Sequence, residues 1–526
     1  MTWKFLLLFV IFPLGEQLHE SYDEALTLWP RSKFELGVDF RFSNVRNYTT
    51  GEESHFITFP RIIQEIVTKY DISKLTITMG QGRWNSQKWG IPPQPAATGG
   101  AQVFAVFKAE NDRKADEKMK FLVEALNGIL CTSLSQLSTV TAPHFVVFSK
   151  DEENYEQRNS YYKRYGILSE ETTCTENLTR LRKLLACKQN GLSTLLHPSK
   201  LYNSIYHSSH LTVSHINHMN YHTIAMEVGV SVIFRSNIGR KQNWSLMGIF
   251  DRKLSSKCLI ANSSVVRVRG RSSDEYFDIK KMLIDANQPL DVDIPQETSK
   301  NDNRIGSVWA SQGGYEQRNG ILTLFVQNGP LDAEVYVTQL MPYYVRTEYS
   351  KLKWSCNQKV QMILKDPAHS KSPTLLQFKL KMKSGQICEL EIPFEKKLLR
   401  LEDYPPDANH GQHIPAAAVH FESSEQSYTV HSSAILVQLP VPDFSMPFNV
   451  ICFVTTAFSL LFGPLNLYST LWLAPMQRKK KVLGVLGRLL AIVLIICCLY
   501  AHIMDINLNE VRRSITGYLE KMNELR

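Results

Sequence analysis

Cysteine is scarce in this sequence, and no two cysteines form a Cys-x-x-Cys pair. Nine cysteines occur among 526 residues, too few for a small domain held together mainly by disulfides. Without the Cys-x-x-Cys spacing, thiol redox catalysis and a zinc ribbon are both poorly supported. A chain of this length is too long for one ordinary domain and predicts two or three.

A generally hydrophobic composition is also lacking. The mean hydropathy is −0.19, which excludes a protein that crosses a membrane many times. The net charge is +9, a balance that can accompany nucleic-acid binding. Nine basic and only four acidic residues fall in positions 475–526, however, so this short segment supplies five of the nine excess charges. We therefore predict no nucleic-acid partner.

Motifs for common enzyme chemistry are missing as well. Neither a Gly-x-Ser-x-Gly nucleophile turn nor a phosphate-binding loop stands out. Gly80 and Gly82 begin a pattern found in dinucleotide loops, but Asn85 occupies the position of the third glycine. The segment with Trp84 and Trp89 is better interpreted as a structural loop or a partner-facing patch.

A histidine-rich segment is the candidate for a metal site. It holds five of the 15 histidines in the chain: His207, His210, His215, His218 and His222. Their spacing matches no His-Glu-x-x-His motif, and no carboxylate interrupts them, so surface and core histidines are the favoured interpretation. We predict no catalytic residue, no metal and no cofactor. A metallo-hydrolase on these histidines is the enzymatic alternative.

The two ends of the chain predict its compartment. Residues 1–17 combine Lys4 with a ten-residue apolar run and a small residue, Gly15, as in a secretory signal peptide. Residues 449–474 carry no charge over a length sufficient for a transmembrane helix. The basic residues of segment 475–488 predict that this segment is cytosolic, which leaves residues 18–448 in the lumen or outside the cell.

A second apolar run, residues 489–504, follows the basic segment. It is short for a span, and it predicts either a second transmembrane helix or a helix that lies in the membrane interface. The tail, residues 505–526, would return to the lumen in the first case.

Residues 18–285 alternate helix and strand signals. Apolar residues recur at helical spacing in 61–70 and 116–130. Strand patterns occupy 33–42, 75–79, 102–107 and 145–148. This order predicts a lumenal α/β region that could contain a split βαβ unit.

Residues 286–304 are polar and aperiodic, which predicts a linker or long loop. Residues 305–448 then show short strand patterns separated by turn residues, which favour a β-sandwich. The expected strands are 321–327, 333–340, 343–349, 360–364, 375–382, 387–392 and 434–439. The turn Lys383–Gln386 is a hairpin signal. The predicted fold class is therefore α+β: an α/β region, a β-sandwich-rich region, and one or two C-terminal transmembrane helices.

The expected lumenal region contains six cysteines and four glycosylation sequons. The sequon residues are Asn47, Asn177, Asn243 and Asn262. The cysteines are Cys131, Cys174, Cys187, Cys258, Cys356 and Cys388, and six cysteines allow fifteen pairings. Cys356 and Cys388 flank neighbouring strand patterns and predict a local disulfide. Cys174 and Cys187 could close a local loop, or Cys174 could be exposed and bonded to another chain.

The segment before the predicted span combines prolines with polar side chains. Residues 439–449 read LPVPDFSMPFN. Asp443, Ser445 and Asn449 supply a carboxylate, a hydroxyl and an amide, groups that can hydrogen-bond sugars or an ammonium group. A rigid connector stiffened by its prolines is the alternative.

Seven stretches together resemble the PIG-T subunit family of the GPI transamidase. They run through nearly the whole predicted ectodomain: GQGRWNSQKWG (80–90), NGILCTSL (127–134), CTENLTRLRKLLAC (174–187), GLSTLL (191–196), NWSL (243–246), YPPDANHG (404–411) and LPVPDFSMPFNVIC (439–452). The stretch at Cys174 and the juxtamembrane stretch are highly specific.

The resemblance implies a non-catalytic subunit of an endoplasmic-reticulum membrane complex that attaches GPI anchors to precursor proteins. It implies an interchain disulfide from Cys174 to a caspase-like catalytic subunit. It also implies contacts to the GPI lipid from Asn409, Asp443, Ser445 and Asn449. Residues 489–526 depart from the family pattern, which ends soon after one span. A free-standing surface receptor or adhesion protein with a β-sandwich ectodomain is the rival function.

Overall fold

The structure is a computed structural model. It describes residues 20–441 except 33, 50–55, 138, 142–159, 170, 172, 219–220, 236–243, 270–273, 280–290, 293, 295–304, 315–317, 357–359, 366–370 and 405–409; it also describes 445–470, 484 and 487–496. The chain divides into two compact units, Met1–Val441 and Pro442–Arg526.

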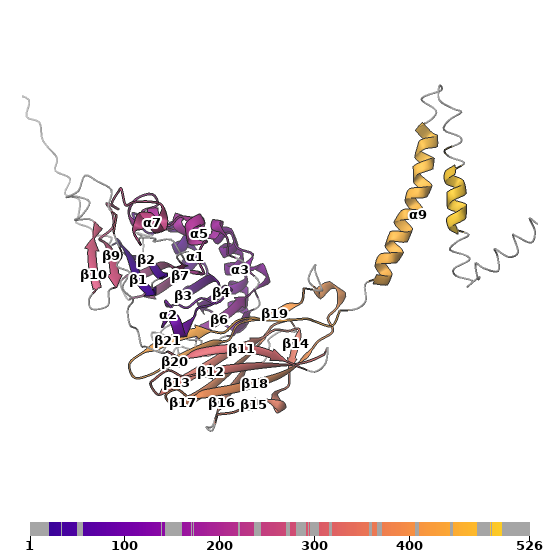
Figure 1. The fold of residues 1–526 in the computed structure, drawn as a ribbon. Coiled ribbons are helices and arrows are strands. Elements are labelled where there is room, and N and C mark those ends of the chain that lie inside the picture. Colours follow the sequence, from indigo (N-terminus) through magenta and orange to yellow (C-terminus); the bar gives the residue numbers. More distant parts are fainter. Residues whose placement is uncertain are drawn as a thin grey trace, which may run out of the picture. The chain divides into compact units, whose positions relative to one another are not determined.

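A ten-stranded sheet forms the N-terminal half of the first unit (Figure 1). Its strands are β1 (Glu20–Ser32), β2 (Glu35–Tyr48), β3 (Ile72–Gln81), β4 (Gly100–Lys108), β5 (Thr139–Thr141), β6 (Tyr161–Leu168), β7 (Tyr206–Asn217), β8 (His222–Arg235), β9 (Ser263–Arg269) and β10 (Asp274–Asp278). Their order is β10-β9-β1-β2-β8-β7-β3-β4-β6-β5. Neighbours are antiparallel except β1 and β9, which run parallel.

Helices cover one face of this sheet (Figure 1). The longer ones are α1 (Arg61–Lys69), α3 (Asp112–Leu130) and α5 (Thr175–Lys183); α6 (Pro198–Leu201) and α7 (Leu246–Phe250) are single turns. The single turn α2 (Ser86–Trp89) lies on the other side of the sheet, beside residues 307–309 of the second half (Figure 1). Helix α3 places Met119, Leu122 and Leu126 in the core, as its apolar spacing predicts. The Asn111 side chain accepts a hydrogen bond from the Lys114 amide and so caps the helix start.

The sequence predictions for this half are largely confirmed. Helices 61–70 and 116–130 correspond to α1 and α3, and strands 33–42, 75–79 and 102–107 to β2, β3 and β4. Residues 145–148 lie outside the described residues. The split βαβ unit is wrong. Helix α1 connects β2 to β3, which the order β2-β8-β7-β3 makes antiparallel to each other, whereas a βαβ unit joins parallel strands.

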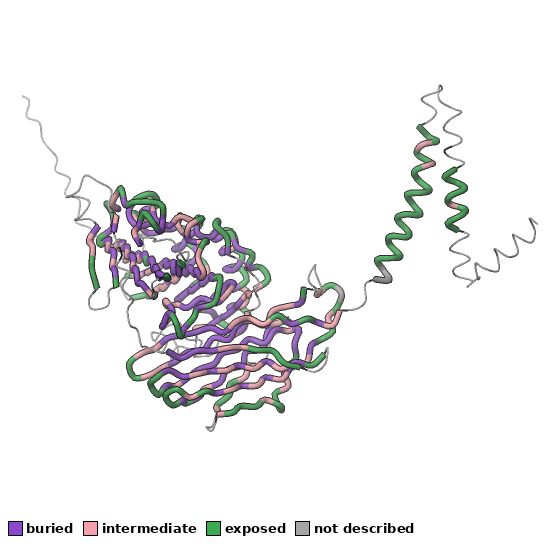
Figure 2. The backbone as a smooth tube through the Cα atoms, in the orientation of Figure 1, coloured by how far each residue is buried: buried purple, intermediate pink, exposed green. Residues whose placement is uncertain are grey.

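A β-sandwich follows, as predicted. One sheet contains β11 (Ser307–Gly313), β12 (Asn319–Gln327), β14 (Val345–Thr347), β15 (Lys353–Trp354) and β18 (Ile387–Lys396). The other contains β13 (Ala333–Met341), β16 (Gln361–Lys365), β17 (Thr374–Met382), β20 (Ala418–Glu422) and β21 (Ser427–His431). A two-stranded ribbon, β19 (Gln412–Ile414) with β22 (Ile435–Val437), completes this half. Apolar residues of both sheets form one buried core (Figure 2).

The hairpin predicted at Lys383–Gln386 is wrong. The turn exists, with the Gln386 amide donating to the Lys383 carbonyl, but β17 pairs with β13 and β16, whereas β18 pairs with β12, β14 and β15. The turn therefore crosses from one sheet of the sandwich to the other. A second crossover, from β12 to β13, lies beside this turn. The backbone amide of Asn328, in that crossover, donates a hydrogen bond to the Gln386 carbonyl.

The face of the ten-stranded sheet opposite the helices packs on the sandwich. Phe104 and Tyr165 of the large sheet share a buried cluster with Leu340 and Leu375 of the sandwich. The Arg83 guanidinium also donates to the Val308 carbonyl at 2.8 Å. The predicted linker, 286–304, lies mostly outside the described residues, but Val292 within it is buried in the N-terminal core.

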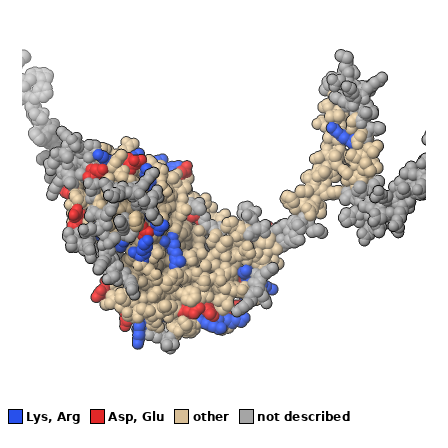
Figure 3. Space-filling model, in the orientation of Figure 1, with Lys and Arg blue, Asp and Glu red and all other residues tan. Residues whose placement is uncertain are grey.

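The second unit contains helix α9 (Ser445–Thr470). Residues Phe448–Thr470 are long and apolar enough to cross a membrane, in agreement with the predicted span, and the described surface of α9 carries no charged side chain (Figure 3). The later apolar run contains the shorter helix Gly487–Ile496. The predicted signal peptide, 1–17, most of segment 475–488 and the tail 505–526 lie outside the described residues.

The loop after α5 is fastened to β1 by a buried carboxylate. Glu24 is 1% exposed. It accepts hydrogen bonds from the Leu192 amide at 3.2 Å and the Ser264 hydroxyl at 2.6 Å. Gly191 has φ +67°, and a Cβ there would lie 2.3 Å from the Glu24 Oε1 atom. The close approach therefore requires glycine at this position.

We predict that Gly191→Ala lowers the free energy of unfolding by about 1–3 kcal/mol, because alanine is strained at positive φ and displaces the Glu24 carboxylate. Denaturant titration of the detergent-solubilised chain measures this change. Gly128→Ala is the matched control. Gly128 is exposed in α3, and a Cβ added there would meet no atom within 4 Å, so alanine should add about 0.5–1 kcal/mol of stability there. Equal effects at both positions would contradict the prediction.

Candidate functional site

Cys174 lies at the start of α5, and its position is fixed by the next turn of that helix. Leu178 and Leu181 are buried, which anchors the helix in the core. The buried Asn177 side chain accepts a hydrogen bond from the Cys174 amide at 2.7 Å. Its Nδ2 atom donates to the carbonyls of Leu130 and Cys131, both at 2.9 Å. The start of α5 is thus tied to the end of α3, while the Cys174 thiol is exposed and free.

The partners of the other cysteines explain why this thiol is free. Cys187 forms a disulfide with Cys258, with a Cα–Cα distance of 5.9 Å. The local Cys174–Cys187 loop, one of the two alternatives, is therefore wrong. The predicted Cys356–Cys388 disulfide is confirmed, with a Cα–Cα distance of 5.1 Å.

Cys131, at the end of α3, is the other free cysteine among the described residues before the span, and it is exposed. The sequence predicts an odd, unassigned thiol if Cys174 is bonded to another chain. Only the fold identifies that thiol as Cys131.

Of the four residues predicted to contact the GPI lipid, the structure describes two. Asn409 and Asp443 lie outside the described residues. Ser445 begins α9, and Asn449, one turn further, is exposed. The structure therefore gives no side-chain geometry that links the four residues.

Described residues on either side of Asn409 contact the end of the first unit, residues 437–440. Strand β19, just after Asn409, pairs antiparallel with β22, just before the juxtamembrane stretch; Gln412 lies opposite Val437. The Tyr404 hydroxyl donates to the Pro440 carbonyl at 2.6 Å. Gly411 has φ +85°, and a Cβ there would meet the Val437 carbonyl oxygen at 2.7 Å. Tyr404 and Gly411, the two ends of the stretch YPPDANHG, thus contact Pro440 and Val437.

A cavity of about 530 Å³ adjoins this contact. Its polar and aromatic lining includes Tyr343, Asp403, Tyr404, Gln412 and His413. The Asp403 carboxylate is paired with Lys371, and burial together with this nearby carboxylate raises the pKa of Tyr343. Tyrosine rings beside a carboxylate and an amide can contact a sugar ring and its hydroxyls. Sequence reasoning missed this cavity, because its residues come from separate strands and loops.

Comparison with known proteins identifies the family of the chain. The model of the family described as "Gpi16 subunit, GPI transamidase component" matches residues 5–237 and 231–481. The chain belongs to the Gpi16 family.

Curated relatives agree over most of their length. The GPI-anchor transamidase component PIGT of Homo sapiens is 27% identical, over 86% of this chain and 90% of that protein. The Mus musculus protein of the same name is 27% identical, over 85% and 89%. The GPI transamidase component GPI16 of Saccharomyces cerevisiae is 24% identical, over 86% and 88%. The chain is therefore a GPI transamidase component, and the receptor or adhesion alternative loses its support.

The histidine-rich segment of this Gpi16 family member is divided among separate hydrogen bonds. His207 contacts Thr173 at 2.8 Å, His210 contacts Glu227 at 3.1 Å, and His222 contacts Asn217 at 2.7 Å. Within the described residues, no group of three or more histidine, cysteine or acidic side chains is placed to hold a metal ion.

The tryptophan loop has a structural role. Trp84 and Trp89 are buried and pack with Tyr206, and the Trp89 indole donates to the buried Glu35 carboxylate. The partner-facing alternative therefore does not describe these two side chains.

The four sequons have different surroundings. Asn262 is exposed, Asn47 is half-buried on β2, and Asn243 lies outside the described residues. Asn177 is buried, and a glycan on its Nδ2 atom would replace one of the two N–H groups that donate to the Leu130 and Cys131 carbonyls, so at least one of these hydrogen bonds would be lost.

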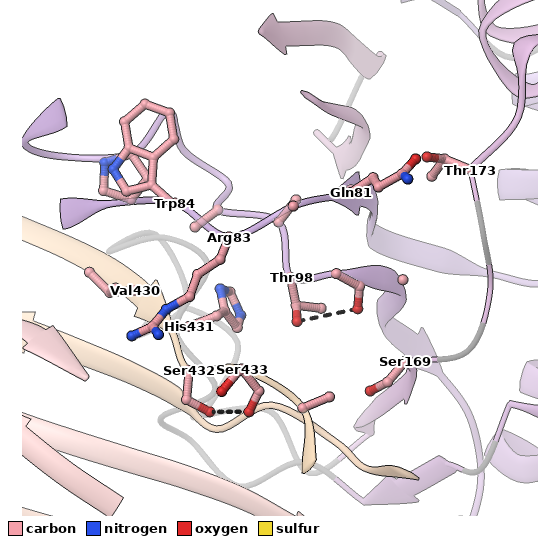
Figure 4. A pocket seen from close by; sticks show the side chains of 18 of the residues that line it. Gln81, Arg83, Trp84, Thr98, Ser169, Thr173, Val430, His431, Ser432 and Ser433 are labelled. Atoms are coloured by element: carbon pink, nitrogen blue, oxygen red, sulfur yellow. Dashed lines mark hydrogen bonds between the residues drawn. The ribbon is translucent and has the colours of Figure 1, made fainter. Parts of the chain in front are cut away.

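A second cavity, of about 350 Å³, lies between the ten-stranded sheet and the sandwich (Figure 4). His431, at the end of β21, lines it together with Arg83, Thr98 and Ser169. His431 is 8% exposed, and neither ring nitrogen has a hydrogen-bond partner among the described residues. Burial lowers the pKa of His431 to about 4, so this imidazole is neutral at pH 7.

We predict that His431 makes the protein less stable in acid. Its folded-state pKa lies below the unfolded value of about 6.5, so between pH 6.5 and 4 the unfolded chain binds a proton that the folded chain does not. Stability is therefore lost as the pH falls through this window, by about 2 kcal/mol at pH 5 from this residue.

His431→Phe should reduce the loss between pH 7 and pH 5 by that amount. Denaturant titrations at the two pH values measure it. Burial also lowers the pKa values of His207 and His215 to about 4. Both residues remain in the variant, so part of the pH dependence of its stability remains. If the wild type and His431→Phe lose the same free energy of unfolding between pH 7 and pH 5, the prediction is contradicted.

Proposed function

We propose that this chain is a non-catalytic scaffold and GPI-recognition subunit of the GPI transamidase complex in the endoplasmic-reticulum membrane, with its first unit in the lumen. Family membership supports the complex, and the missing nucleophile motifs agree with a non-catalytic role. The two intrachain disulfides suit an oxidising compartment. Helix α9 serves as the membrane anchor, followed by the basic segment on the cytosolic side.

The observation that carries the proposal is the free, exposed thiol of Cys174 on a rigid support. Every other cysteine before the span except Cys131 has a partner within the chain. A disulfide requires the two Cα atoms to lie within about 7 Å, so a bond from Cys174 would place the caspase-like catalytic subunit directly against the start of α5.

Cys174→Ala should abolish a high-mass adduct with the catalytic subunit, because this substitution removes the only sulfur proposed to form the bond. A non-reducing gel of the purified complex, probed for both chains, measures the loss. The matched control is Cys131→Ala, which removes a free, exposed thiol from the neighbouring helix end and should leave the adduct intact. An adduct that persists without Cys174 would sink the proposal.

The GPI-recognition part rests on chemistry near the membrane surface. Asp443 offers a carboxylate to the ammonium group of the GPI headgroup. Ser445, Asn449 and Asn409 offer hydroxyl and amide groups to its phosphates and sugars. The contact between Tyr404 and Pro440 supports a common site, since these two residues are close in sequence to Asn409 and Asp443. The adjoining cavity of about 530 Å³ leaves room for glycan residues.

Combined alanine substitution of Asn409, Asp443, Ser445 and Asn449 should lower GPI attachment at least tenfold, since charge-assisted hydrogen bonds each contribute about 1.5–3 kcal/mol. Surface display of a GPI-anchored reporter in cells that lack the endogenous subunit measures attachment, and co-purification confirms assembly. Asn466→Ala, an exposed amide near the other end of α9, is the control. Normal attachment with all four alanines would refute the assignment.

A further inference from the structure

The two free thiols before the span lie at two helix ends that share one amide group. Cys131 ends α3 in the left-handed conformation, with φ 56°, and its carbonyl accepts from Asn177 Nδ2. Cys174 precedes α5, and its amide donates to Asn177 Oδ1. One side chain thus binds the backbones of both cysteines and holds the two helix ends together.

This proximity creates a competition. In an oxidising compartment, neighbouring thiols can form a disulfide with each other by thiol–disulfide exchange. A Cys131–Cys174 bond would consume the sulfur that the interchain bond needs. Exchange begins with a thiolate, so the outcome depends on whether Cys131 loses its proton.

Glu176, in the first turn of α5, controls that proton. The Cys131 thiol donates a hydrogen bond to the Glu176 carboxylate, with an Sγ–Oε2 distance of 3.1 Å. This hydrogen bond, with the negative charge of Glu176, raises the pKa of the Cys131 thiol, while the positive charge of Arg180 opposes the shift. A thiolate at Cys131 would face the carboxylate directly, so the protonated form is favoured.

We propose that Glu176 is a positioning residue that keeps Cys131 a protonated bystander and so reserves Cys174 for the bond to another chain. This inference rests on the proposed interchain disulfide. Its first prediction, the reactivity of Cys131, does not.

The reaction that Glu176 suppresses is a balanced exchange. A Cys131 thiolate attacks the Cys174 sulfur of the interchain disulfide, and a Cys131–Cys174 bond forms as the Cys174–partner bond breaks. The partner's sulfur leaves as a thiolate and takes up a proton, with no net oxidation. In the unassembled chain, oxidised glutathione supplies the disulfide and leaves as two molecules of reduced glutathione.

Glu176→Gln tests the mechanism, because glutamine keeps the shape and a hydrogen-bond acceptor but removes the charge. In full-length protein with Cys174→Ala, the rate at which iodoacetamide alkylates Cys131 should rise several-fold at pH 7.5, and the pH midpoint of the rate should fall. Glu171→Gln is the matched control, since the Glu171 carboxylate accepts from a backbone amide, that of Ser133 at 2.8 Å, rather than from a thiol. An unchanged Cys131 profile in Glu176→Gln overturns the inference.

The second test measures, in the assembled complex, how much Cys174 is bonded to the partner chain and how much to Cys131. With Cys174 present, Glu176→Gln should reduce the interchain adduct several-fold, and peptide mass spectrometry should detect a Cys131–Cys174 disulfide. Adding Cys131→Ala should restore the adduct. An adduct that stays low in this double variant overturns the inference, since Glu176 would then act on assembly alone. An absent adduct in the wild-type complex would refute the interchain bond instead, and the alkylation profile would still decide the role of Glu176.

Discussion

A buried carboxylate at the beginning of the chain organises the surface that carries the free thiols. Glu24 of β1 binds the Leu192 amide after α5 and the Ser264 hydroxyl of β9. Burying a charge is costly unless hydrogen bonds satisfy it, so both segments must be in place for the fold to be stable. The Cys187–Cys258 disulfide joins the same two segments. The loop that follows α5 is therefore held at two points, Cys187 and Leu192, and α5 presents Cys174 from a fixed support.

Local patterns predicted the elements that local physics determines. The apolar spacing in α1 and α3 and the alternation along β12, β17 and β18 all correspond to observed elements. Pairing partners were not predictable in the same way. The turn at Lys383–Gln386 has the residues of a hairpin, yet it joins two sheets. The pairing partners of β17 and β18 depend on how the apolar faces of all the sandwich strands pack together, which no local pattern records. The parallel pairing of β1 with β9 joins residues 240 positions apart, beyond any local signal.

The candidate site shows the same division. Cys174 could be singled out from sequence because its surrounding stretch is distinctive, but its freedom depends on Cys187 bonding to Cys258 across 71 positions. Fifteen pairings were open from sequence. The contact between Glu176 and Cys131 spans 45 positions and depends on how α3 and α5 end against each other. Asn177 was noticed as a sequon, whereas in the structure its amide is the link between the two helix ends.

The place of β1 between β2 and β9 also bears on how the chain is made. β2 leaves the ribosome directly after β1, but the other edge of β1 waits for residues 263–268. At about 5–20 residues per second, these residues are synthesised roughly 10–50 s later. For that time β1 has an open edge able to pair with other strands, and Glu24 lacks its serine partner. A nascent chain at this stage presents a strand edge that a chaperone can shield, and residues more than two hundred positions further along the chain later cover that edge.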